Sequence, residues 1–394
     1  MAKALQNPAS LATDPSGACK RGEPSGKGHG PDDLCAHLEN LYSDQPQPKC
    51  TVIFPGKMIH NLHFLRGVAA LMVVAHHGLY VLYRNDLIDH HPGLGVLGVD
   101  LFFVISGFVI VISTKPTTTP IDFLRRRFLR VVPLYWLVTL CVFGLFIVDS
   151  LAGESSNLPT LAELIKSLLF IPYEPVIERS MPVLLVGWTL YFEVFFYLIF
   201  FIGLSVLTVD KVVFGVGLAI AAFAALGLVI PSTLVSLNFY SNPVILEFVW
   251  GMILAVIWKQ HRAWLSKLHP LMVYAMVGFG LAFLVLSNGA HNPFVAGIGA
   301  ALLIGAALGF EVRGQVVKSN LSNFFGNISY ALYLIHFTYF FIAEAILTNM
   351  GLIDNFAATL TGLVAAFIGA CFLAWMSFRL VETPLAQLAR PSPR

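Results

Sequence analysis

Two residues in the first apolar segment could carry out acid–base chemistry inside a membrane. Arg66 and His77 are eleven positions apart. In a helix this spacing is about three turns and about 16 Å of rise, so both side chains lie on one face. Histidine titrates near neutral pH and is the commonest general base in enzymes. We expect His77 to accept a proton and Arg66, at the cytoplasmic edge, to hold phosphate groups of a donor or line its path.

Four further ionisable residues lie within apolar segments, namely Asp100, Glu193, Glu247 and His336. From the helical rise, they lie roughly 9 to 18 Å from the nearest end of their segments, in the same outer-to-middle layer as His77. Buried acids and histidines must pair with one another or line water. We therefore expect one polar cavity ringed by these side chains.

Each residue of this cavity receives an expected role. His77 is the general base, and Asp100 orients its imidazole, as in a His–Asp pair. Glu193 belongs to the catalytic centre, where it binds acceptor hydroxyls or tunes the cavity. The expected lining of the substrate cavity is Glu247, His336, Trp188 and Tyr330.

A basic cluster at 125–130 could bind phosphates of a soluble, cytoplasmic donor. Its members are Arg125, Arg126, Arg127 and Arg130. No Ser or Cys stands in a GxSxG elbow, so the sequence does not indicate a covalent nucleophile. Direct attack by a hydroxyl that His77 deprotonates fits better.

Structural roles remain open for the same residues. Arg66 could be an interfacial anchor whose guanidinium snorkels to the headgroups. His77 could pack between helices, and Glu193 could hydrogen-bond a neighbouring helix. The arginine cluster also acts as a topology signal, and Glu382 at the end of the last span favours a salt bridge to it.

Composition places these residues in a membrane protein. The 394 residues are 57% hydrophobic and 12% charged, with a mean hydropathy of +0.77, whereas soluble domains are about 25% charged. This excludes a mainly disordered chain and a disulfide scaffold. A net charge of +2 excludes nucleic acid as a natural partner. The five cysteines show no metal-ligand spacing, so we expect no metal site.

We predict an all-α, polytopic transmembrane bundle of about ten spans. We predict that residues 1–57 are a disordered polar tail or result from a misassigned start of translation. Residues 58–387 are predicted to form the transmembrane domain, and residues 388–394 a short cytoplasmic tail. A short amphipathic stretch at 161–170 is predicted to lie at the membrane–water interface. The predicted spans are 62–83, 94–113, 131–149, 184–207, 212–230, 239–258, 271–287, 292–310, 324–349 and 356–379.

Lysine and arginine set the orientation of these spans. With a cytoplasmic N-terminus, twelve of these residues fall in or beside inside loops and three in outside loops. This bias predicts that both termini are cytoplasmic and that the chain is a multi-pass protein of the inner cell membrane.

Four motifs resemble the membrane-bound acyltransferase-3 family. They are LHFLRGVAALMVVAHH at 62–77, GVDLFFVISGF at 98–108, RRRFLRVVPLYW at 125–136 and GWTLYFEVFFY at 187–197. Weaker matches follow at 246–255, 328–336 and 380–385, so the resemblance covers about 61–385.

The resemblance implies a bundle of about ten helices that transfers an acyl group, usually acetyl from acetyl-CoA, to a saccharide hydroxyl. Arg66 and His77 match residues regarded as essential, Asp100 and Glu193 match the family's acids, and the basic cluster lies near the presumed CoA site. The partners implied are acyl-CoA, a saccharide and the lipid bilayer. Here His63 replaces a common Asp and Val194 follows the single Glu193, departures that fit the exopolysaccharide branch.

Two other functions use the same residues differently. A proton-coupled transporter of a sugar or other small solute also needs buried histidines and carboxylates. Against it, the first-span motif has no counterpart in the second half of the chain. A catalytically inactive family member is disfavoured by the intact Arg66, His77 and Asp100.

Overall fold

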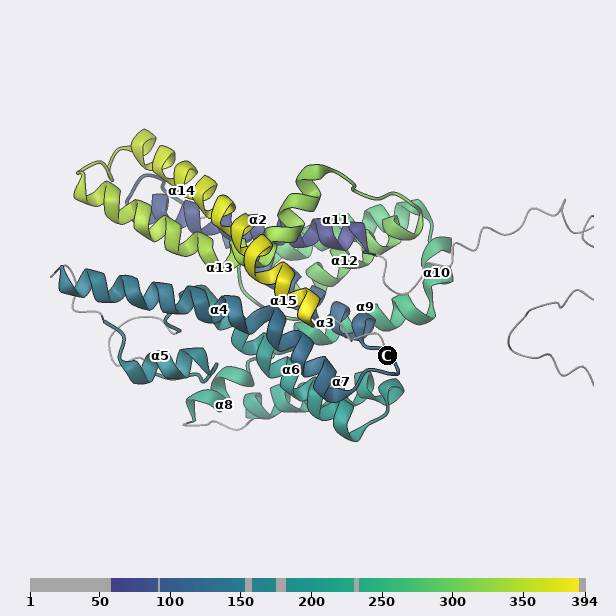
Figure 1. Ribbon diagram of the computed structural model, residues 1–394. Helices are drawn as coiled ribbons and strands as arrows, with labels where there is room; N and C mark the ends of the chain where they lie inside the picture. The colour runs from purple at the N-terminus through teal and green to yellow at the C-terminus, as the bar shows by residue number, and fades with distance from the viewer. Residues whose placement is uncertain (1–57, 91–92, 153–157, 175–181, 230–233, 390–394) are drawn as a thin grey trace, which may run out of the picture. The chain divides into compact units, whose positions relative to one another are not determined.

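The computed structural model describes residues 58–90, 93–152, 158–174, 182–229 and 234–389. The predicted tail at 1–57, and residues 390–394 of the predicted tail at 388–394, lie outside the described residues. Within the described part, regular structure is entirely helical, which confirms the all-α class (Figure 1).

Among the residues that the structure describes, seven helical segments are long and apolar enough to cross a membrane, and the chain is a multi-pass membrane protein. Three shorter apolar helices accompany them: α3 (Gly98–Ser113), α11 (Pro270–Leu286) and α12 (Ala296–Val312). Each of the ten predicted spans coincides with one of these segments; ten crossings and cytoplasmic termini stay predictions. The seven are built on α2 (His60–Arg84), α4 (Pro120–Leu151), α6 (Trp188–Val206), α7 (Val209–Val229), α9 (Leu246–Gln260), α13 (Asn320–Asn349) and α14 (Phe356–Ser377).

Short helices connect the long ones. The predicted interfacial stretch is helix α5 (Leu161–Leu168), where Thr160 and Glu163 form a capping box. The other short helices are η1 (Gly93–Leu97), η2 (Leu185–Gly187), α8 (Val235–Tyr240), η3 (Pro243–Ile245), α10 (Arg262–Lys267) and α15 (Thr383–Leu388).

Helix α4 begins eleven residues before the predicted start at 131. Thr119 caps it by accepting a hydrogen bond from the Asp122 backbone N–H, and Pro120 occupies the first turn. Backbone N–H groups of the first turn have no partner within the helix, so proline, which has no N–H, loses no hydrogen bond there. The arginine cluster at 125–130 is therefore helical and not the loop that we predicted. A helix holds these side chains at fixed spacing.

Two pairs of parallel helices form the centre of the bundle. Helix α2 lies along α13, with Arg66 beside Ser329 and His77 beside His336. Helix α3 lies along α9 through glycines: a Cβ on Gly107 would come 2.1 Å from the Phe248 carbonyl oxygen, and one on Gly251 would come 2.0 Å from that of Val104. Such close backbone contact is typical of membrane helices that pack through small residues.

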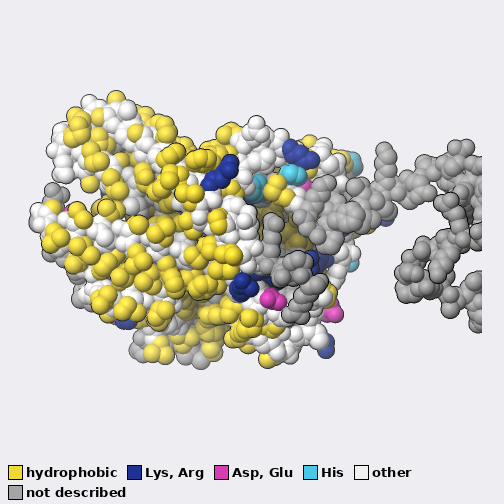
Figure 2. All heavy atoms as spheres, in the orientation of Figure 1, with side chains coloured by type: hydrophobic (Ala, Val, Ile, Leu, Met, Phe, Trp, Pro, Cys, Tyr) yellow, Lys and Arg dark blue, Asp and Glu magenta, His cyan; other side chains and the backbone are white. Residues whose placement is uncertain are grey.

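The outer surface is apolar over most of one face. Figure 2 shows hydrophobic side chains covering the part occupied by α4, α13 and α14, with charged side chains gathered toward the opposite end. Large side chains such as Leu140, Val148 and Phe372 are exposed there by 49%, 65% and 60%. An apolar surface of this extent is what lipid contact requires.

The C-terminal helix does not stop at 379 as predicted. After α14 it passes through a π-helical turn, Phe378–Glu382, and continues as α15. π-Helical turns are rare and frequently lie at functional sites. This turn directs Glu382 toward the arginines of α2 and α4.

Candidate functional site

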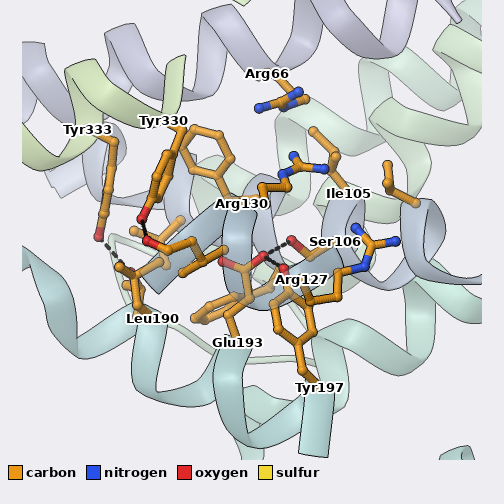
Figure 3. Close-up of a pocket in the computed structure, with 16 residues that line it drawn as sticks. Arg66, Ile105, Ser106, Arg127, Arg130, Leu190, Glu193, Tyr197, Tyr330 and Tyr333 are labelled. Carbon is orange, nitrogen blue, oxygen red and sulfur yellow. Dashed lines mark hydrogen bonds between the residues drawn. The ribbon is translucent and has the colours of Figure 1, made fainter. Parts of the chain in front are cut away.

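An inner cavity lies between α2, α3, α4, α6 and α13 (Figure 3). Its volume of about 60 Å³ suits a narrow chain or a few waters. Three arginines reach it, Arg66 from α2 and Arg127 and Arg130 from α4. Opposite them is one carboxylate, Glu193 of α6, so the cavity carries excess positive charge.

Hydroxyl groups hold the Glu193 carboxylate in place. Ser106 of α3 donates a hydrogen bond to Oε1 at 2.9 Å, and Tyr197, one turn along α6, donates to the same oxygen. The predicted contact between Glu193 and a neighbouring helix is therefore present, and Glu193 also lines the cavity.

Tyrosines of α13 form the opposite wall. Tyr330 donates to the Val131 carbonyl oxygen at 2.6 Å, and Tyr333 donates to that of Val186 at 2.8 Å. Both side chains line the inner cavity. Tyr330 was predicted to line the substrate cavity, and Tyr333 was not singled out by the sequence.

A wider cavity of about 550 Å³ shares Arg66, Arg127 and Arg130 with the inner one. It is lined as well by Arg126, Glu382 and residues of α15. Its volume is in the range of small-molecule sites. Arg125 lines neither cavity; its side chain is exposed and donates to the Leu388 carbonyl oxygen at 3.2 Å. The helical turn thus separates Arg125 from the other three arginines.

His77 is paired with His336, not with Asp100 as predicted. Nδ1 of His77 lies 3.0 Å from Nε2 of His336, whose side chain is fully buried on α13. The aromatic ring of Phe337 packs edge-on against His77. The helical rise gives the depth of a side chain but not which helices are neighbours, so depth alone could not choose between Asp100 and His336.

The hydrogen bonds fix the tautomers of this histidine pair. Nδ1 of His336 lies 3.0 Å from the Leu332 carbonyl oxygen, which can only accept, so this nitrogen carries the proton. In the neutral ring Nε2 of His336 is then an acceptor, and Nδ1 of His77 must donate to it. Nδ1 of His77 also lies 3.0 Å from the Val73 carbonyl oxygen, which agrees with a donor. Nε2 of His77 therefore carries the basic lone pair.

Asp100 and Glu247 form a separate group. Asp100 accepts a hydrogen bond from Nδ1 of His291 at 2.9 Å, and the Glu247 carboxyl lies within hydrogen-bonding reach of Asp100. His291 was not predicted, because it is a lone histidine in the turn NGAHNP at 288–293. Nothing in its spacing distinguishes it from an ordinary loop residue.

The two cavities described do not bring all the predicted residues together. The predicted residues fall into three groups: Glu193 with the arginines, His77 with His336, and Asp100 with Glu247, a pair that the unpredicted His291 joins. His77, Asp100, Glu247 and His336 line neither of the two cavities described. Trp188 does not line them either, since its ring packs on His291 at 5.4 Å. No cluster suited to a metal is present among the described residues.

The chain is similar in sequence to several curated proteins. The chain is 34% identical over 313 residues to the exopolysaccharide production protein ExoZ of Rhizobium meliloti, an alignment covering 79% of this chain and 95% of that protein. It is 24% identical over 382 residues to the peptidoglycan O-acetyltransferase OatA of Listeria monocytogenes, covering 86% and 57%. It is 30% identical over 259 residues to the acyltransferase MdmB of Streptomyces mycarofaciens, covering 63% and 62%.

The family comparison covers most of the chain. The family model described as "Acyltransferase domain" matches residues 59–376, which include the arginines, both histidines of the pair, and Asp100, Glu193 and Glu247. No solved structure matches the chain. The match favours an acyltransferase over the transporter considered from the sequence. The chain belongs to the acyltransferase-3 family and is a membrane-embedded acyltransferase.

Proposed function

We propose that this acyltransferase transfers an acyl group, acetyl in the simplest case, from acyl-CoA to a hydroxyl of a surface or exopolysaccharide saccharide in the inner cell membrane. Two of the relatives, an exopolysaccharide production protein and a peptidoglycan O-acetyltransferase, support a glycan acceptor by their names. The observation that carries the proposal is the histidine pair, whose hydrogen bonds support Nε2 of His77 as the basic nitrogen.

The two cavities suit the two parts of an acyl-CoA donor. The wide cavity, about 550 Å³ in volume and lined by four arginines, has the size and charge to bind the nucleotide and its phosphates. The inner cavity is too narrow for a nucleotide, and Arg66, Glu193 and Tyr333 are among the residues that line it. We assign it to the thin end of the donor, which carries the acyl group.

Catalysis then needs the transfer of one proton from the acceptor hydroxyl, through His77, to the sulfur of CoA. Nε2 of His77 takes the proton of the acceptor hydroxyl while the oxygen attacks the thioester carbonyl carbon. The carbon–sulfur bond breaks, and the proton passes from His77 to sulfur, which leaves an ester and the thiol of CoA. His336 fixes the tautomer of His77 throughout, the role that an aspartate has in a Ser–His–Asp triad.

The test is transfer by the purified chain in lipid nanodiscs. Isotope-labelled acetyl-CoA is mixed with oligosaccharides from the cell's own surface polysaccharide, de-esterified by mild alkali, and the products are analysed by mass spectrometry. We expect an alkali-labile labelled ester that requires both substrates. Absence of the ester from protein that is folded and binds acetyl-CoA would contradict the proposal and favour an inactive family member.

A further inference from the structure

The first turns of α3 and α9 bring two fully buried carboxyl groups into contact. Asp100 and Glu247 are each 0% exposed, and each lies in the first turn of its helix. The close contact of the two helices through Gly107 and Gly251 fixes their register. The meeting of the two acids is therefore built into the backbone packing.

Hydrogen-bond donors are scarce around these two carboxyl groups. If both are treated as acceptors only, Oδ1 of Asp100 and both oxygens of Glu247 have no donor in the described part of the chain. Two buried carboxylates in contact repel each other and lose their hydration. One proton between them removes a charge and creates an O–H···O hydrogen bond.

His291 completes the group at the edge of the buried region. Its Nδ1 donates to Oδ2 of Asp100 at 2.9 Å, so in the neutral ring Nε2 is left as an acceptor. The imidazole side chain is 22% exposed, whereas Asp100 is fully buried. A buried acid thus holds a partly exposed imidazole in one tautomer.

An aromatic ring accompanies this imidazole. Trp188, half-buried at the start of α6, packs on His291 with ring centroids 5.4 Å apart. The two acids have small or apolar neighbours on the adjoining helices. Gly297 of α12 lies against Glu247, and Ala69 and Val73 of α2 lie against the start of α3, close to Asp100 in sequence. An indole ring beside a fixed hydrogen-bond acceptor offers an apolar ring face and a hydroxyl partner together.

We propose that His291 and Trp188 form an acceptor-binding subsite for a saccharide, in which Nε2 of His291 accepts a hydrogen bond from a sugar hydroxyl and Trp188 packs on the sugar ring. Asp100 and Glu247 act as positioning residues that hold the imidazole. The reaction in which this subsite takes part rests on the proposed function, but saccharide binding does not require acyl-CoA. The subsite is distinct from the His77–His336 pair, which acts on the proton.

The experiment measures binding and transfer separately. Purified chain in nanodiscs is titrated with the de-esterified oligosaccharides in the absence of acyl-CoA, with tryptophan fluorescence and calorimetry as readouts. His291→Phe keeps a ring against Trp188 but removes the acceptor nitrogen, and Asp100→Asn removes the charge that holds the imidazole. His261→Phe, at an exposed position between α9 and α10, is the matched control.

We expect His291→Phe and Asp100→Asn each to weaken saccharide binding by about tenfold or more, the loss of one hydrogen bond to a polar site. In the transfer assay the KM for the saccharide rises while the KM for acyl-CoA is unchanged. The double variant should lose no more saccharide affinity than the weaker-binding of the two single variants, because the two residues act as a unit.

Two results would overturn the inference. The first is that well-folded His291→Phe binds the saccharide as tightly as the His261→Phe control. The second is that the wild-type chain transfers acyl groups and that neither His291→Phe nor Asp100→Asn changes the KM for the saccharide. If the wild-type chain shows no acyl transfer while its saccharide binding still depends on His291, the proposed reaction is rejected and the subsite stands. Thermal unfolding of each variant verifies that it is folded.

Discussion

Nε2 of His336 lies 3.0 Å from Nδ1 of His77, and this contact links α13 to α2 in the middle of the bundle. Because the Leu332 carbonyl oxygen fixes the proton on Nδ1 of His336, the contact also decides which nitrogen of His77 is basic. His336 thus takes the position that the sequence assigned to Asp100.

The first prediction concerns this acceptor nitrogen. His336→Leu removes the hydrogen-bond partner of His77, so we expect kcat to fall about 10- to 100-fold, equivalent to ~1.4–2.7 kcal/mol of barrier, with the KM for acyl-CoA unchanged. His336→Gln provides a side-chain oxygen that can accept the same proton and should recover part of the loss. Steady-state kinetics of transfer measure both effects. Equal losses in the Leu and Gln variants would show that His336 acts through packing alone.

The second prediction separates the arginines of α4. Arg130 lines both cavities, whereas Arg125 lines neither. Arg130→Ala should raise the KM for acyl-CoA by about tenfold or more, since a hydrogen bond between charged groups contributes about 1.5–3 kcal/mol. Arg125→Ala is the matched control and should leave this KM within about twofold, because it removes no cavity-lining charge. A larger effect from Arg125→Ala would place the donor phosphates outside the two cavities.

The third prediction concerns the packing that positions Asp100 and Glu247. A Cβ on Gly251 would come 2.0 Å from the Val104 carbonyl oxygen, so α3 and α9 must move apart in Gly251→Ala. We expect a loss of about 1–3 kcal/mol in stability. Gly144→Ala on α4 is the control, since no atom lies within 4 Å of the added methyl group. Unfolding of detergent-solubilised protein measures both; equal stability of the two variants would contradict the close contact.

Hydropathy and motif order were sufficient for much of the fold. Each predicted span coincides with an apolar helix, because about 20 apolar residues in a row have few alternatives in a membrane. The start of α4 was missed for a local reason: the charged residues at 125–130 lower the hydropathy, although Thr119 and Pro120 provide a helix start. A reading of capping residues alongside hydropathy would have found it.

The grouping of the site was harder to predict than its members. Depth along a helix follows from the helical rise, but the neighbour of each helix depends on packing between segments far apart in sequence. Gly107 and Gly251 bring Asp100 to Glu247, and Gly67 lies against Phe325 and Gly326 where α2 meets α13. These glycines could be read as packing positions, yet one sequence does not say which glycine meets which.

The most direct test of the account is the rate of acyl transfer by His77→Ala in nanodiscs, compared with wild type and with the exposed control His261→Ala. Removal of a general base costs about 10²- to 10⁴-fold, so we predict at least a loss of about 100-fold for folded His77→Ala that still binds acyl-CoA, and none for the control. Transfer by His77→Ala within about threefold of wild type would contradict the role of His77, and with it the meaning assigned to the contact with His336.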